Sequence, residues 1–129
     1  MARNDLEDRL IRFAIFIIKL AESLPKVGIC IQLSDQMTRS SCSAAQNYGE
    51  AQSAESTKDF IHKLKVVLKE LRETNVSLKI LDGLDKAPDP VKVKEGIQEA
   101  NELIAIFLKS IDTARKNAAQ TKIIKPSRT

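Results

Sequence analysis

The sequence predicts an all-α protein folded as an antiparallel, up-down-up-down four-helix bundle. In four separate stretches, apolar residues recur at spacings of three and four, the period that places them on one face of a helix. Proline, glycine and polar clusters separate these stretches by short connections, and short connections make consecutive helices antiparallel. Only 4% of the 129 residues are aromatic and none is Trp, so the core must be aliphatic.

The first helix is expected from about residue 4 to residue 24. Its main apolar stripe consists of Leu6, Leu10, Phe13, Ile17, Leu20 and Leu24. A second apolar set lies beside the stripe and widens the apolar face: Ile11, Ala14, Ile15, Ile18 and Ala21. A helix with so wide an apolar face contacts more than one neighbour, or another subunit covers part of it.

The second helix is expected from about residue 29 to residue 50, after a turn marked by Pro25 and Gly28. Its apolar stripe is Leu33, Met37, Ala44, Tyr48 and Ala51. Small residues fill the middle of this helix, in the run SSCSAA at 40–45. Because side-chain size sets the distance between packed helices, this run predicts the close approach of a neighbouring helix.

The third and fourth helices begin with recognisable capping residues. Ser56 and Asp59 have the spacing of a capping box, with Asp in the place of the usual Glu. The stripe that follows, to about residue 81, is Phe60, Leu64, Val67, Leu71, Leu78 and Leu81, with Thr74 as one polar position. Asp89 as N-cap and Pro90 as the first helical residue open the last helix. Its stripe is Val93, Ile97, Ala100, Ile104, Phe107, Ile111, Ala114 and Ala118.

Five polar residues of the second helix have the spacing that normally belongs to a buried apolar stripe. These residues, which we call the polar ladder, are Gln36, Arg39, Ser43, Asn47 and Glu50. At about 100° per residue they fall within an arc of about 80°, on a flank of the helix. One interpretation is a structural polar network, within the chain or between subunits, in which Arg39 pairs with an acid such as Glu50 or Glu73. The other is a groove for a ligand or a nucleic acid. A buried charge without a partner costs several kcal/mol, which favours the network.

The net charge of +4 is concentrated at the C-terminal end of the chain. Residues 115–129 contain no acid and five basic residues, Arg115, Lys116, Lys122, Lys125 and Arg128. Without these five, acidic residues slightly outnumber basic ones, which argues against a nucleic-acid-binding body. We therefore expect a bundle over residues 1–118 and a flexible basic tail over residues 119–129. The tail is either solvated or an electrostatic arm for RNA or DNA, whose weak contact an oligomer would multiply.

The sequence contains no signature of an enzyme or of a metal site. The candidates for a carboxylate metal site are Glu50, Glu70, Glu73 and His62, but the Glu-x-x-His motif of di-iron bundles is missing. No nucleophile elbow or phosphate-binding glycine loop is present. We expect no catalytic residue, no cofactor, no metal and no small-molecule substrate.

Cys30 and Cys42 are expected to be free thiols. If both lie on the second helix they are roughly 18 Å apart along its axis, whereas a disulfide needs Cα atoms within about 7 Å. Reduced cysteines suit a reducing compartment. No apolar run is long enough to span a membrane, and the N-terminal MARNDLEDRL lacks the pattern of a secretory signal. These features predict a soluble, cytoplasmic protein with no membrane partner.

The stretch QMTRSSCSAAQNYGEA resembles the signature of the bacterial four helix bundle protein family, also called the 23S rRNA intervening-sequence or S23 ribosomal protein family. The polar ladder occupies the Gln, Arg, Ser, Asn and Glu positions of that signature. Residues 56–60 match the Ser-Thr-Lys-acid-Phe run that follows it, and Glu73 matches a Glu typical of the third helix. The resemblance covers about residues 5–117.

The resemblance implies an antiparallel four-helix bundle that forms homopentamers and has no established enzymatic activity. A related bundle is an accessory protein of diversity-generating retroelements, where it binds reverse transcriptase and nucleic acid. Two hypotheses follow. The first is a non-enzymatic, homo-oligomeric assembly or interaction module whose only expected partner is itself. The alternative is an accessory protein that binds RNA or DNA through the basic tail and Arg39.

Overall fold

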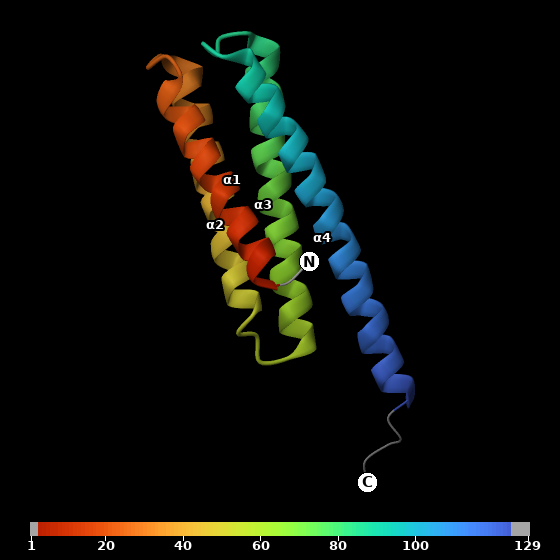
Figure 1. Ribbon diagram of the computed structural model, residues 1–129. Helices are drawn as coiled ribbons and strands as arrows, with labels where there is room; N and C mark the ends of the chain where they lie inside the picture. The colour runs from red at the N-terminus through yellow and green to blue at the C-terminus, as the bar shows by residue number, and fades with distance from the viewer. Residues whose placement is uncertain (1–2, 125–129) are drawn as a thin grey trace.

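The computed structural model describes residues 3–124, with side chains for residues 5–120, and consists of four helices. These are α1 (Arg3–Ser23), α2 (Gly28–Ala51), α3 (Thr57–Leu84) and α4 (Pro90–Ile124). Consecutive helices run antiparallel and pack side by side (Figure 1). The predicted all-α, up-down-up-down bundle is therefore confirmed. Contact between α1 and α4, which closes the bundle, is the sparsest of the four helix pairs.

The helix ends follow the predicted capping chemistry. The Ser56 hydroxyl accepts a hydrogen bond from the backbone N–H of Asp59 at 3.0 Å, as expected for an N-cap. Pro90 is the first residue of α4, where its missing N–H costs nothing. Asp85 ends α3 in the left-handed conformation, with φ of 55°. Aspartate tolerates this conformation better than most residues, and its N–H donates to the carbonyls of Leu81 and Asp82.

The core forms where the predicted apolar stripes meet. Every predicted stripe residue of α1 and α2 is buried. Tyr48 of α2 and Phe107 of α4 pack edge to face across the core, with ring centroids 5.5 Å apart. The stripe predicted for α4 needs a correction, because Leu103 is fully buried whereas Ile97 and Ile104 remain partly exposed. Val93, Ala100, Phe107 and Ile111 of the predicted row are buried, whereas Ile97 and Ile104 pack at the edge of the core.

The wide apolar face of α1 is only half covered by its own chain. Ala14 and Ala21 are buried. Ile11 and Ile15 keep 43% and 46% of their surface exposed, and Ile18 is half-buried. An apolar strip along α1 therefore faces outward.

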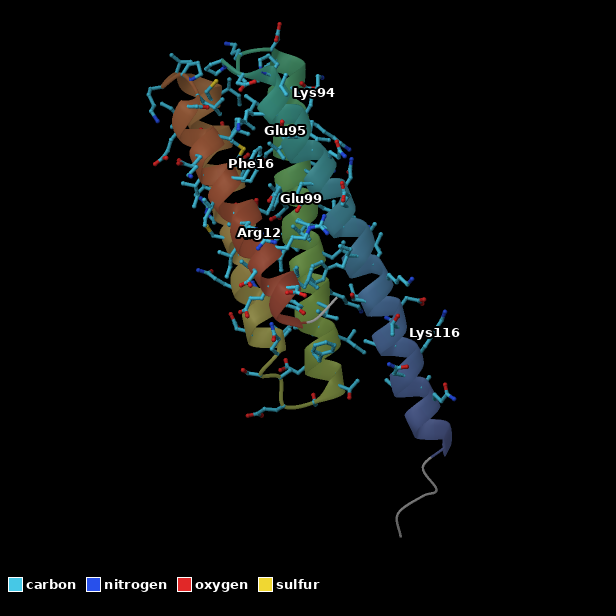
Figure 2. All side chains as sticks on the ribbon, viewed as in Figure 1. Arg12, Phe16, Lys94, Glu95, Glu99 and Lys116 are labelled. Atoms are coloured by element: carbon cyan, nitrogen blue, oxygen red, sulfur yellow. The ribbon has the colours of Figure 1, made fainter. Side chains whose placement is uncertain are left out.

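Charged and aromatic side chains bridge α1 and α4. The Arg9 guanidinium donates to both carboxylate oxygens of Glu99, at 2.7 and 2.8 Å, and to Glu102 at 3.1 Å. The hydrogen bonds that Arg9 donates to Glu99 raise the pKa of Arg9. Phe16 of α1 lies in contact range of Gly96 of α4, where an added Cβ would meet the ring at 3.2 Å. Phe16 and Glu99 both lie along the boundary between the two helices (Figure 2).

The C-terminal part of α4 extends past the start of α1 and past the α2–α3 connection (Figure 1). Helical backbone continues to Ile124, beyond the boundary predicted at residue 118. Residues 125–129 lie outside the described residues, so the flexible tail stays a prediction. None of the helices in the described part of the chain is long and apolar enough to cross a membrane. Cys30 and Cys42 are both free, as predicted.

Candidate functional site

An open groove of about 650 Å³ runs along the outer side of α2 and α3 and contains part of the polar ladder. Gln36 and Arg39 line it from α2, and Glu73 lines it from α3. The structure thus brings together three of the residues that the sequence singled out. The flank of α2 that carries the ladder faces its sequence neighbour α3.

The bottom of this groove is a buried contact between small polar side chains. The hydroxyls of Ser40 and Thr74 lie 2.6 Å apart, and both residues are buried. Thr74 donates its own proton to the carbonyl of Glu70 at 3.0 Å. The Ser40 hydroxyl also lies 3.4 Å from the carbonyl of Met37, so either hydroxyl can be the donor in the Ser40–Thr74 pair. The small residues predicted to allow close helix approach do so at this contact.

The other three residues of the polar ladder, Ser43, Asn47 and Glu50, form hydrogen bonds within the chain. Asn47 donates to the backbone carbonyl and the hydroxyl of Ser43, at 2.9 and 3.0 Å. Both are half-buried on α2 and satisfy each other within one helical turn. Glu50 accepts a hydrogen bond from Lys63 of α3 at 2.9 Å, and this bond raises the pKa of Lys63. The acid that we expected as a partner for Arg39 thus pairs with a lysine across the α2–α3 contact.

Arg39 is exposed in the groove and forms no hydrogen bond or ion pair with any described residue of its own chain. Its predicted role in a network between subunits stays a prediction. Glu70 and Glu73 lie on the opposite wall. Partial loss of hydration, and then the hydrogen bond with Glu70, raise the pKa of Glu73. Lys69 Nζ is 4.0 Å from Glu70. The groove therefore carries charges of both signs, with a carboxyl pair that shares a hydrogen bond.

Comparison with known families assigns the chain to a family. The family model for the 23S rRNA-intervening sequence protein matches residues 4–119. The chain belongs to this family. Its fold is similar to a crystal structure of a protein with unknown function from the S23 ribosomal protein family of Bacteroides thetaiotaomicron. That similarity has a TM-score of 0.75 and 28% identity, and it covers 87% of this chain and 99% of the other. No curated protein matches the chain.

The five basic residues predicted as nucleic-acid contacts at the C-terminal end separate into three groups. Arg115 and Lys116 are exposed on α4, and Lys116 pairs with Asp112 at 3.0 Å and projects away from the bundle (Figure 2). Lys122 lies in the helical part of α4, and its side chain is outside the described set. Lys125 and Arg128 lie outside the described residues altogether.

A second groove, of about 320 Å³, lies between α3 and α4 and brings Arg115, which the sequence singled out, together with basic residues of α3 that it did not. Lys65, Lys69 and Arg72 line it from α3, and Arg115 lines it from α4. The spacing of four and three between Lys65, Lys69 and Arg72 was the available signal, because it places them on one side of a helix.

Among the residues that the structure describes, no group of three or more His, Cys, Asp or Glu side chains is placed to hold a metal ion. His62, the single histidine of the sequence, is exposed at the start of α3. The chemistry that the two grooves can provide is charge pairing and apolar contact, which are the interactions of a binding surface.

Proposed function

We propose that this family member is a non-enzymatic, homo-oligomeric helical bundle that acts as an assembly or interaction module. The exposed strip of Ile11, Ile15 and Ile18 on α1 is the observation that carries the proposal. Each buried Å² of apolar surface contributes roughly 25 cal/mol, so an uncovered isoleucine row favours association. The proposal includes a reducing, cytoplasmic location, which the two free cysteines support.

A second exposed apolar row supports assembly into a ring. Val76 and Ile80, at the edge of the α2–α3 groove, are 56% and 46% exposed, and Leu84 continues the row. Assembly into a ring needs each copy to present one surface to one neighbour and a different surface to the other, which is a heterologous contact that closes when its rotation allows. We propose the pentamer that the family resemblance implies.

Light scattering coupled to gel filtration tests this proposal at micromolar concentration. The expected mass is about five times the 14.4 kDa of the chain, and a monodisperse monomer would refute it. Ile11→Ser with Ile15→Ser should shift the protein towards the monomer. Val91→Ser is the matched control, because Val91 is an equally apolar and 63% exposed residue on another helix. Equal effects of the two variants would argue against a specific α1 contact.

A second candidate function is nucleic-acid binding by the basic end of the chain. The observation in its favour is the extension of α4 beyond the other helices, with Arg115 and Lys116 exposed along it. Binding through phosphate contacts weakens steeply with salt, because each contact releases counterions. Replacing Lys122, Lys125 and Arg128 with Gln should weaken binding to a single-stranded RNA oligomer and flatten its salt dependence. Binding that both changes leave unaltered would exclude this mechanism.

A further inference from the structure

The exposed isoleucine row of α1 has an acidic residue at each end. Asp8, Ile11, Ile15, Ile18 and Glu22 follow one another at spacings of three and four, so they form one row along the helix. Asp8 and Glu22 are exposed, and neither forms an ion pair with a described residue of the chain. The row is therefore an apolar strip with one unpaired negative charge at either end.

The α3–α4 groove has the complementary pattern. Its apolar part comes from Leu68, Ile111 and Leu108, of which Leu108 is 46% exposed. Because α3 and α4 are antiparallel, Lys65 and Arg115 lie at one end of the groove and Arg72 lies at the other. These three cations form no ion pair within the described chain. The groove therefore has positive charge at both ends of an apolar centre.

We infer that the α1 row of one copy docks into the α3–α4 groove of the next copy. The inference rests on the proposed self-assembly and names the two surfaces that meet. Apolar side chains face apolar side chains, and Asp8 and Glu22 approach the cationic ends, which fixes the register and orientation of the contact. The α1–α2 pair and the α3–α4 pair form opposite sides of the bundle (Figure 1). Each copy can therefore offer its row to one neighbour and its groove to another.

The two grooves differ in their suitability for this occupant. The α2–α3 groove carries charges of both signs, because Glu70 and Glu73 lie beside Arg39, Lys69 and Arg72, so it would repel as well as attract the acidic ends of the row. In the α3–α4 groove, Asp112 is already paired with Lys116 at 3.0 Å. A nucleic-acid strand fits the α3–α4 groove less well, because no aromatic side chain lines it for base stacking. A second copy of the chain satisfies both the apolar centre and the charged ends.

Charge reversal with internal rescue tests the contact. Lys65→Glu with Arg72→Glu and Arg115→Glu, and separately Asp8→Lys with Glu22→Lys, should each raise the concentration at which the oligomer dissociates by about tenfold or more. The variant that carries all five changes should recover the wild-type mass, since both ends of the contact are again attractive. Lys58→Glu with Lys86→Glu reverses charge at exposed sites elsewhere and should leave assembly unchanged. Circular dichroism checks that each variant keeps its helices.

The outcomes separate the two proposals. A wild-type monomer overturns both of them. A wild-type oligomer that tolerates both sets of reversals, or that the variant with all five changes fails to restore, overturns only the docking inference. Unchanged mass with loss of RNA binding on reversal of Lys65, Arg72 and Arg115 would also overturn it and assign the groove to nucleic acid.

Crosslinking gives a readout that does not depend on charge. In a Cys42→Ala background, Ile15→Cys in one copy and Leu108→Cys in another should join through a short bis-maleimide. The mixed sample should yield a crosslinked dimer, and the two variants alone should not. Absence of that dimer from an oligomeric mixture would overturn the inference.

Discussion

The α2–α3 boundary and the α1–α4 boundary hold the same bundle together by different means. Between α2 and α3, Ser40 and Thr74 are buried with their hydroxyls 2.6 Å apart. Between α1 and α4, Arg9 reaches across to Glu99 and Glu102 from a position that keeps 20% of its side chain exposed. The first boundary is close-packed by small residues, and the second is bridged by long charged ones.

Because of this difference, each boundary should be sensitive to a different kind of perturbation. A close-packed interface has no room for added atoms, so side-chain volume controls its stability. An ion pair near the surface tolerates changes of volume but depends on ionic strength. The two boundaries should therefore respond to different substitutions and to different solution conditions.

The largest effect is expected from filling the α2–α3 boundary. Ser40→Leu adds bulk at a buried contact between α2 and α3 and removes the hydroxyl that bonds Thr74. Overpacking costs roughly 1–3 kcal/mol, and losing a buried hydrogen bond costs about 1 kcal/mol more. Urea denaturation monitored by circular dichroism measures the loss. Gln46→Leu, on the exposed side of α2, should stay within about 0.5 kcal/mol of wild type. Equal losses in the two variants would show that the boundary is not volume-limited.

The sequence predicted the close-packed α2–α3 boundary but not the charge bridge between α1 and α4. The run SSCSAA predicts a close helix contact because its residues are small and adjacent in the chain. Arg9 and Glu99 are 90 positions apart, and each has the spacing of an ordinary surface charge. Only the packing of α1 against α4 makes them neighbours. Local periodicity therefore predicts which face is buried, whereas pairs of exposed charges depend on tertiary arrangement.

The same distinction applies to the candidate site. The spacing of the polar ladder puts Gln36 and Arg39 on one flank of α2, and the groove beside that flank is also lined by Glu73. The partner of Glu50 could not be read from the ladder, because Lys63 lies on the next helix, beyond the α2–α3 connection. The cationic α3–α4 groove was missed for a similar reason. Rows on α3 and α4 resemble two solvated faces until the helices lie side by side.

An intermediate effect is expected from removing the charge bridge between α1 and α4. Arg9→Met keeps the apolar stem of the side chain and removes both contacts with the acids. Surface ion pairs contribute about 0.2–1 kcal/mol, and the two-pronged bond to Glu99 places this one near the upper end. The loss, measured by urea denaturation, should shrink in about 1 M NaCl, where the Debye length falls to roughly 3 Å.

Arg12→Met is the matched control for the charge bridge. Arg12 is an exposed arginine on the same helix, so its removal should change stability less than the removal of Arg9. A loss in Arg9→Met that is independent of salt would assign the contribution of Arg9 to packing of its stem. The two boundaries would then differ less than their contacts suggest.

The smallest effect is expected at the outer edge of the α2–α3 boundary, where Glu73 introduces a titrating group. Its pKa is raised above the ordinary value of 4.5, first by partial loss of hydration and then by its hydrogen bond with Glu70. The folded protein therefore binds this proton more tightly than the unfolded chain does. The resulting stabilisation is complete below pH 4.5 and is lost as the pH rises through the raised pKa.

Glu73→Gln should remove this part of the pH dependence, because the amide does not titrate. The variant should match wild type near pH 4 and be slightly more stable than wild type at pH 7, as measured by thermal melting across that range. Glu70→Gln removes the second carboxyl and should weaken the same dependence. If Glu73→Gln kept the wild-type pH profile, the carboxyl pair would not be the titrating element. The α2–α3 boundary would then depend on side-chain volume alone, which would make its contrast with the charge-dependent α1–α4 boundary complete.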